Sequence, residues 1–129
     1  MYWTHNFNES KSPCRVNQGS ASIDHHIYSF GGYCQQKKFT ELKNRSPIDV
    51  NILNTITFKW RALERPTRED DEQYAKTPYY RYGHSCVAYD RAIYLFGGRA
   101  DWSNNLDNEL YKFDPSNFCN SNIYIYIAN

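Results

Sequence analysis

The hydrophobic and polar positions of this chain follow one arrangement that occurs twice. In each copy an Asp and a polar neighbour separate two short apolar stretches, and the second stretch ends in Phe followed by two glycines. The copies are Ser22–Gly32 and Ala88–Gly98, and in both the Asp stands seven residues before the first glycine. Because an internal repeat constrains architecture more than any other sequence signal, the chain is predicted to contain two similar units.

Each unit is predicted to begin with a β-hairpin. Asp24-His25 and Asp90-Arg91 separate the paired apolar stretches and have the composition of tight turns. The second stretch reads Ile-Tyr-x-Phe, without strict polar alternation, which is typical of a strand buried on both faces. The glycine pairs Gly31-Gly32 and Gly97-Gly98 then predict a sharp strand exit, because glycine permits positive φ and close backbone approach.

Two further strands complete the predicted unit. Third strands are expected at Ile48–Ile52 and Leu110–Phe113, followed by turns at Asn54-Thr55 and Asp114-Pro115. A fourth strand, Thr57–Trp60, closes the first copy. Four antiparallel strands joined by hairpins describe one blade of a β-propeller.

The repeat divides the chain into five segments. We expect an N-terminal segment 1–12 that could supply a closing strand, a first repeat 13–64, a polar inter-blade loop 65–80, an incomplete second repeat 81–119 and a tail 120–129. Asn120 stands at the aligned place of Trp60, and the tail alternates Ile and Tyr. This alternation could form a strand, but its simple composition favours a tail outside the repeat.

Composition supports this assignment and excludes several classes of function. Aromatic residues make up 17% of the 129 residues, which favours strands. A net charge of +1 predicts no general attraction to nucleic acid or anionic membrane, and no apolar run approaches the length of a membrane span. Without a secretory signal at the N-terminus, the cysteines are expected to be reduced thiols of a cytoplasmic or nuclear protein: Cys14, Cys34, Cys86 and Cys119.

The two units resemble the kelch repeat. The first matches through Gly31-Gly32, Val50–Ile52 and Trp60, and the second through Gly97-Gly98 and Leu110-Tyr111 without the Trp. The resemblance implies an all-β fold, a partial kelch β-propeller of about two four-stranded antiparallel blades. Two blades without neighbours would leave sheet faces uncovered, so marginal stability or self-association is expected.

The resemblance also implies a function. Kelch proteins similar to this chain act as substrate receptors of cullin-2 RING ubiquitin ligases and recognise the C-terminal degrons of client proteins. Client tails are therefore the expected partners, with elongin and cullin-2 binding only in a full-length form; this chain is expected to be a truncated form. The alternatives are a chromatin-associated nuclear kelch protein with a meiotic role and a non-functional fragment.

No enzymatic activity, cofactor or metal is expected. The sequence carries no phosphate loop, nucleotide fingerprint or catalytic signature. His84 and Cys86 could bind a metal, but no second pair has ligand spacing, so His84 is expected to anchor a buried strand. Gln18 occupies the corresponding place in the first copy. A galactose-oxidase-type enzyme is disfavoured because no Tyr/Cys/His copper constellation has matching spacing.

Two loop positions in each blade are implied to face the central pocket of such a propeller. One precedes the first strand and the other follows the double glycine. Arginine binds carboxylates through a planar, permanently charged fork, and tyrosine supplies a rigid wall with a hydroxyl donor. The candidates for a peptide carboxylate site are Arg15, Tyr33, Arg81, Tyr82 and Arg99. In the alternative, Arg15 and Arg81 are structural and bond aromatic rings and carbonyls between blades.

Overall fold

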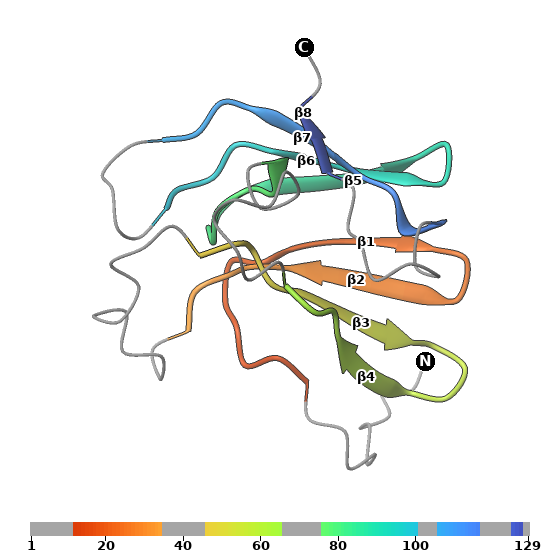
Figure 1. The fold of residues 1–129 in the computed structure, drawn as a ribbon. Helices are drawn as coiled ribbons and strands as arrows, with labels where there is room; N and C mark the ends of the chain where they lie inside the picture. The colour runs from red at the N-terminus through yellow and green to blue at the C-terminus, as the bar shows by residue number, and fades with distance from the viewer. Residues whose placement is uncertain (1–11, 35–45, 66–75, 101–105, 117–124, 128–129) are drawn as a thin grey trace, which may run out of the picture.

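The computed structural model describes residues 12–34, 46–65, 76–100, 106–116 and 125–127. These residues form two four-stranded antiparallel sheets, each with its strands in sequence order (Figure 1). Blade 1 contains β1 (Gly19–Ile23), β2 (His26–Phe30), β3 (Val50–Asn54) and β4 (Lys59–Ala62). Blade 2 contains β5 (Ser85–Tyr89), β6 (Ala92–Phe96), β7 (Leu110–Phe113) and β8 (Ile125–Ile127). The predicted all-β fold of two antiparallel blades is confirmed.

The two predicted hairpin turns lie where the sequence places them. Asp24-His25 connects β1 to β2 and Asp90-Arg91 connects β5 to β6, with both turns on the right in Figure 1. Asp24 has a φ of 50° and Asp90 a φ of 48°. Asp tolerates this left-handed conformation better than most residues, because its short side chain can bond nearby backbone. Local turn chemistry therefore sets the register of both hairpins.

The third and fourth strands of blade 1 were each predicted two residues too early. β3 begins at Val50 rather than Ile48, because Ile48 donates its N–H to the Pro78 carbonyl at 2.8 Å, outside the sheet. The turn after β3 is also longer than expected. The Asn54 side chain accepts bonds from the N–H groups of Ile56 and Thr57, and the chain resumes as β4 only at Lys59.

The end of the chain also differs from the expectation. The sequence favoured a tail outside the repeat over a strand, but Ile125–Ile127 form β8. This strand pairs antiparallel with β7, with Phe113 opposite Ile125. The alternation of Ile and Tyr is thus a strand pattern here, and blade 2 has its fourth strand.

The core lies between the two blades, which stack face to face in Figure 1. One face of blade 1 packs against one face of blade 2, and Phe113 is central to this contact. Its ring lies 5.6 Å from that of Tyr28 and 5.2 Å from that of Phe30, both in tilted or edge-on geometry. The buried members of the core are Tyr28, Phe30, Ile48, Val50, Ile52, Ile93, Leu95, Tyr111 and Phe113.

The expectation that both Ile-Tyr-x-Phe strands are buried on both faces is wrong for blade 2. Ile93 and Leu95 of β6 are buried against blade 1, whereas Phe96 is 53% exposed. Phe96 lies on the opposite face of the sheet, because side chains alternate along a strand. Among the residues that the structure describes, no third sheet covers that face.

The glycine pairs have the role expected of them. Gly32 has a φ of 94° and Gly98 a φ of 97°. A Cβ on Gly32 would lie 2.8 Å from the Gln18 Cβ, and one on Gly98 would lie 2.9 Å from the His84 Cβ. Any side chain would collide with the loop that precedes the first strand, so glycine allows strand exit and loop to pack together.

Several expectations lie wholly or mostly outside the described residues. They concern the N-terminal segment, most of the loop 65–80, and the positions of Cys119 and Asn120. Within the described part, Cys14, Cys34 and Cys86 are free thiols, and Cys14 is exposed. Among the described residues, no helix has the length and apolar character needed to cross a membrane.

Candidate functional site

The two loop positions singled out in each repeat pair with one another through the backbone. In blade 1, Val16 and Tyr33 exchange N–H···O bonds of 2.9 and 2.7 Å. In blade 2, Tyr82 and Arg99 exchange equivalent bonds of 3.1 and 2.9 Å. The loop before the first strand and the loop after the double glycine therefore form one short ladder in each blade.

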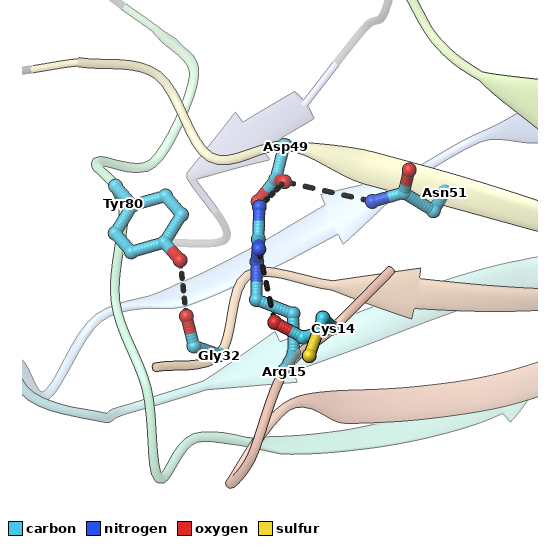
Figure 2. A network of polar contacts seen from close by, with 6 residues as sticks. All are labelled: Cys14, Arg15, Gly32, Asp49, Asn51 and Tyr80. Carbon is cyan, nitrogen blue, oxygen red and sulfur yellow. Dashed lines mark hydrogen bonds and ion pairs between the residues drawn. The ribbon is translucent and has the colours of Figure 1, made fainter. Parts of the chain in front are cut away.

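The two ladders are joined to each other across the blade boundary. The N–H of Gly32 donates to the Arg81 carbonyl at 2.9 Å, and the N–H of Gly83 donates to the Asn17 carbonyl at 2.9 Å. The Tyr80 hydroxyl donates to the Gly32 carbonyl (Figure 2). These bonds hold the loops of blade 1 and blade 2 as one continuous edge of the molecule.

The surface of this edge combines aromatic, aliphatic and cationic side chains. The half-buried rings of Tyr33 and Tyr82 meet edge to face, with centroids 5.8 Å apart. Arg99 is exposed beside them, and exposed Leu106 pairs with Arg99 through the backbone. Val16 is exposed at the other end. We call these five residues the rim: Val16, Tyr33, Tyr82, Arg99 and Leu106.

Arg81 points into the protein and not toward the rim surface. Its side chain is 1% exposed, and its guanidinium donates to the Gly97 carbonyl at 3.1 Å and forms a 2.5 Å ion pair with Asp107. The guanidinium carbon also lies 5.0 Å from the centroid of the Tyr111 ring, within the range of a cation–π contact. Arg81 thus cross-links the double-glycine exit of blade 2 to the chain that leads into β7.

Arg15 occupies the equivalent position in blade 1 but has a different partner. Its Nη2 lies 2.9 Å from an Asp49 carboxylate oxygen, and its Nη1 donates to the Cys14 carbonyl (Figure 2). Burial tends to lower the pKa of Arg15, but the Asp49 carboxylate, with smaller contributions from Tyr80 and Cys34, raises the pKa overall and stabilises the cation. Arg15 Nε and Asp49 Oδ1 are buried without a hydrogen-bond partner in the described structure.

The acidic residues that hold these arginines were not found from the sequence. Asp49 and Glu109 both precede the third strand of their blade, and each accepts a bond from the residue two positions later, Asn51 or Tyr111. Asp107 lies in the stretch before β7. An acid just before the third strand was an available signal for Asp49, whereas in blade 2 the same signal indicates Glu109, which bonds Tyr111 and not Arg81. The aromatic or amide partner two residues later could have strengthened it.

His84 forms the buried junction between the blades. Its Nε2 accepts a hydrogen bond from the Gly19 N–H at 3.1 Å, which agrees with the expected anchoring role. Burial, with a further contribution from the Arg81 charge, lowers the pKa of His84 to about 4. Among the described residues, no group of three His, Cys, Asp or Glu side chains could hold a metal ion.

The structure therefore separates the five predicted site residues into two sets. Tyr33, Tyr82 and Arg99 lie together on the rim, whereas Arg15 and Arg81 are bonded inside the protein. Their role in binding a peptide carboxylate remains a prediction. The rim is the part of that predicted site which a ligand could reach in this conformation.

Comparisons with known proteins give a consistent result. Two family models, each described as the Kelch motif, match residues 14–67 and 80–126. Kelch domain-containing protein 3 is 39% identical over 102 residues in both Bos taurus and Homo sapiens, which covers 79% of this chain and 26% of the relative. Leucine-zipper-like transcriptional regulator 1 of Pongo abelii is 57% identical over 66 residues, covering 50% of this chain and 8% of the relative. The matched stretch thus spans about a quarter of the first of these relatives.

Proposed function

This chain belongs to the kelch-repeat family, and from that premise we propose that it binds the C-terminal tails of other proteins through its rim. Kelch repeats are typically protein-interaction modules rather than enzymes. The observation that carries the proposal is the Tyr33–Tyr82 ring contact beside exposed Arg99, formed where the loop after the double glycine of blade 1 meets the loop before the first strand of blade 2.

The chemistry of the rim fits an extended peptide that ends in a carboxylate. An exposed guanidinium can receive a carboxylate through two parallel N–H···O bonds, and this contact is worth more beside apolar surface than in open water. The tyrosine rings give a rigid wall with little conformational entropy to lose. Val16 and Leu106 add apolar surface at the two ends of the rim.

We further propose that the peptide tails are degrons and that the protein serves as a substrate receptor of a cullin-2 RING ubiquitin ligase. The support is the kelch family resemblance together with an accessible cation on the rim. Such a receptor would act in the cytoplasm or the nucleus. A form extended to the length of the relatives is expected to co-precipitate elongin and cullin-2. Recovery of neither would reject the ligase role and leave tail binding open.

The direct test compares peptides with a free and an amidated C-terminus. A library of fluorescent C-terminal peptides, including tails that end in glycine, would be titrated with the chain and followed by anisotropy. We expect a free carboxylate to bind about tenfold more tightly than the amide, because one charge-assisted pair contributes about 1.5 kcal/mol. In Arg99→Ala this preference should disappear, since the group that distinguishes acid from amide is gone.

Arg65→Ala is the matched control, because Arg65 is also an exposed arginine but lies beyond β4. It should retain the wild-type preference for the acid. Tyr82→Ala should weaken acid and amide alike, since it removes ring contact without touching the charge. If no tail binds, or if amidation has no effect on the tails that do, the proposal is wrong.

A further inference from the structure

Blade 2 carries an exposed face with aromatic and aliphatic side chains on the side away from blade 1. In the registered sheet, Phe96 lies opposite Leu110, and Tyr94 lies between Val87 and Lys112. Phe96 is 53% exposed, Val87 60% and Tyr89 72%. Together with the half-buried Tyr94, Leu110 and Lys112, these side chains form the outer face of blade 2, in which Lys112 is the one cation among the described side chains. Contiguous apolar surface of this kind marks an interaction site.

The repeat indicates what this face is suited to contact. The equivalent positions of blade 1 are Tyr28, Phe30, Val50 and Ile52, because Phe30 pairs with Val50 directly before its glycine pair, as Phe96 does with Leu110. All four are buried, and they form the half of the core that blade 1 contributes. The outer face of blade 2 therefore has the position at which a kelch blade packs onto its next neighbour.

The complementary face is present on blade 1 itself. Blade 2 meets blade 1 with Cys86, Ile93, Leu95, Tyr111 and Phe113, and the equivalent positions on the outer side of blade 1 are Ser20, Ile27, Ser29, Asn51 and Leu53. Ile27 and Leu53 remain apolar, and Trp60 lies opposite Leu53 on the same side. The serines are small, so they leave room for the larger side chains of the other face.

Polar groups at the hairpin turns of the two outer faces are also complementary in charge. Within the chain, Arg91 of the blade 2 turn pairs with Asp24 of the blade 1 turn at 2.6 Å. On blade 2, Asp90 is equivalent to Asp24. On blade 1, His25 is equivalent to Arg91. Both Asp90 and His25 are exposed. The His84–Gly19 bond has a counterpart too. Ser85 is equivalent to Gly19 as the donor. Gln18 is equivalent to His84, and its amide oxygen can accept the bond.

We propose that a second copy of this chain docks head to tail, with the outer face of its blade 1 on the outer face of blade 2. The contact would repeat the inter-blade interface already seen inside the chain, with the His25–Asp90 pair in place of Arg91–Asp24. Such a heterologous interface differs from a two-fold dimer, in which both copies use one and the same patch. Pairing two blade 2 faces would leave the blade 1 residues Ile27, Leu53 and His25 outside the contact.

The test begins with three single variants measured by sedimentation and native mass spectrometry. Wild type should assemble with rising concentration, whereas Phe96→Asp on blade 2 and Leu53→Asp on blade 1 should each raise the dissociation constant at least tenfold. Phe58→Asp is the matched control, because Phe58 is 52% exposed at the β3–β4 turn, away from both faces. It should assemble like wild type.

Mixing the variants distinguishes head-to-tail docking from a two-fold arrangement, in which both copies use the same face. Phe96→Asp retains an intact blade 1 face, and Leu53→Asp retains an intact blade 2 face. An equimolar mixture should therefore form a one-to-one complex that neither variant forms alone. If Leu53→Asp forms dimers by itself, the contact is a two-fold pairing of blade 2 faces and the proposal is wrong.

Two further variants protect the test against loss of folding. Tyr89→Asp and Ser22→Arg alter exposed positions on the same two faces, so they block contact without touching the core. Circular dichroism would confirm that each variant retains its sheets. A wild-type chain that stays monomeric up to its solubility limit, or a mixture that stays monomeric, would overturn the proposal.

Discussion

The Nε2 atom of His84 accepts a hydrogen bond from the backbone N–H of Gly19, and this 3.1 Å bond joins the two blades at their first strands. An accepting Nε2 has no proton, so the neutral ring must carry its proton on Nδ1. Nδ1 is buried and has no hydrogen-bond partner among the described residues. The junction therefore depends on a neutral imidazole in a buried site near the Arg81 cation.

Because of this histidine, the protein is predicted to become less stable as the pH is lowered. The pKa of His84 is about 4 in the folded protein against 6.5 for an ordinary histidine. The unfolded state thus binds the proton first, and the contribution of His84 is full above about pH 6.5 and lost as the pH falls to about 4. The expected loss is about 3 kcal/mol. Urea unfolding across this range measures it.

The control for the pH effect is His84→Gln. The amide oxygen of glutamine can still accept the Gly19 N–H, but it does not titrate. Carboxylate titrations contribute equally to both proteins, so the difference between their stabilities isolates His84. A difference that stays constant between pH 6.5 and 4 would contradict the predicted neutral histidine.

Gly19 is predicted to tolerate no side chain. A Cβ at this position would lie 2.5 Å from the Cys86 sulfur and 2.6 Å from the His84 ring. Because both neighbours belong to the other blade, Gly19→Ala should push the blades apart and cost about 1 to 3 kcal/mol. Ser20→Ala, at the exposed next residue, should change the free energy of unfolding by less than about 0.5 kcal/mol. Equal effects would show that no close packing exists at Gly19.

Buried Arg81 and exposed Arg91 are predicted to differ strongly in their contribution to stability. Arg81→Met leaves Asp107 and the Gly97 carbonyl without their donor, so we expect a loss of about 3 kcal/mol. The Arg91–Asp24 pair is exposed on both sides, and Arg91→Met should cost less than about 1 kcal/mol. Chemical unfolding of both variants provides the comparison. A small loss for Arg81→Met would mean that methionine packing on Tyr111 compensates for the lost pair.

Phe113 is predicted to be the most sensitive aromatic residue of the inter-blade core. Phe113→Leu removes the ring contacts to both Tyr28 and Phe30 and should lower the free energy of unfolding by about 1 to 2 kcal/mol. The same substitution at exposed Phe58 should change stability by less than about 0.5 kcal/mol. Thermal unfolding at one fixed protein concentration would compare them. Matching melting temperatures for the two variants would contradict the packing described here.

The cysteines are predicted to differ in reactivity. Burial raises the pKa of Cys86 to about 12, so almost no thiolate is present there at mildly alkaline pH. Cys14 is exposed. Alkylation of the native protein followed by mass spectrometry should therefore modify Cys14 at least about tenfold faster than Cys86. Comparable rates in the folded protein would show that the blade junction opens readily.

The sequence predicted those parts of the fold that depend on local chemistry. Turns at Asp24 and Asp90 and the exits at the glycine pairs follow from residues that tolerate positive φ, and all were placed correctly. The start of β4 could not be predicted, because it depends on the Asn54 side chain bonding Ile56 and Thr57 across the turn. The hydrophobic pattern of β6 also led to the wrong prediction that Phe96 is buried, because its burial depends on a covering sheet and not on its own hydrophobicity.

The candidate site shows a similar division. Position in the repeat brought Tyr33, Tyr82 and Arg99 to the same edge, as expected for loops that recur in each blade. The direction of Arg15 and Arg81 could not be inferred from position, because distant acids decide it. Arg15 meets Asp49 and Arg81 meets Asp107, although the two arginines occupy equivalent places in their blades.

The face-to-face packing of the blades has a consequence during synthesis on the ribosome. Blade 1 residues up to Ile52 emerge well before Phe113, the residue that covers Tyr28 and Phe30. About 60 residues separate Ile52 from Phe113. At a synthesis rate of about 5–20 residues per second, the apolar face of blade 1 therefore stays uncovered for roughly 3 to 12 seconds. The pace of translation through this stretch sets how long the nascent chain needs protection by chaperones.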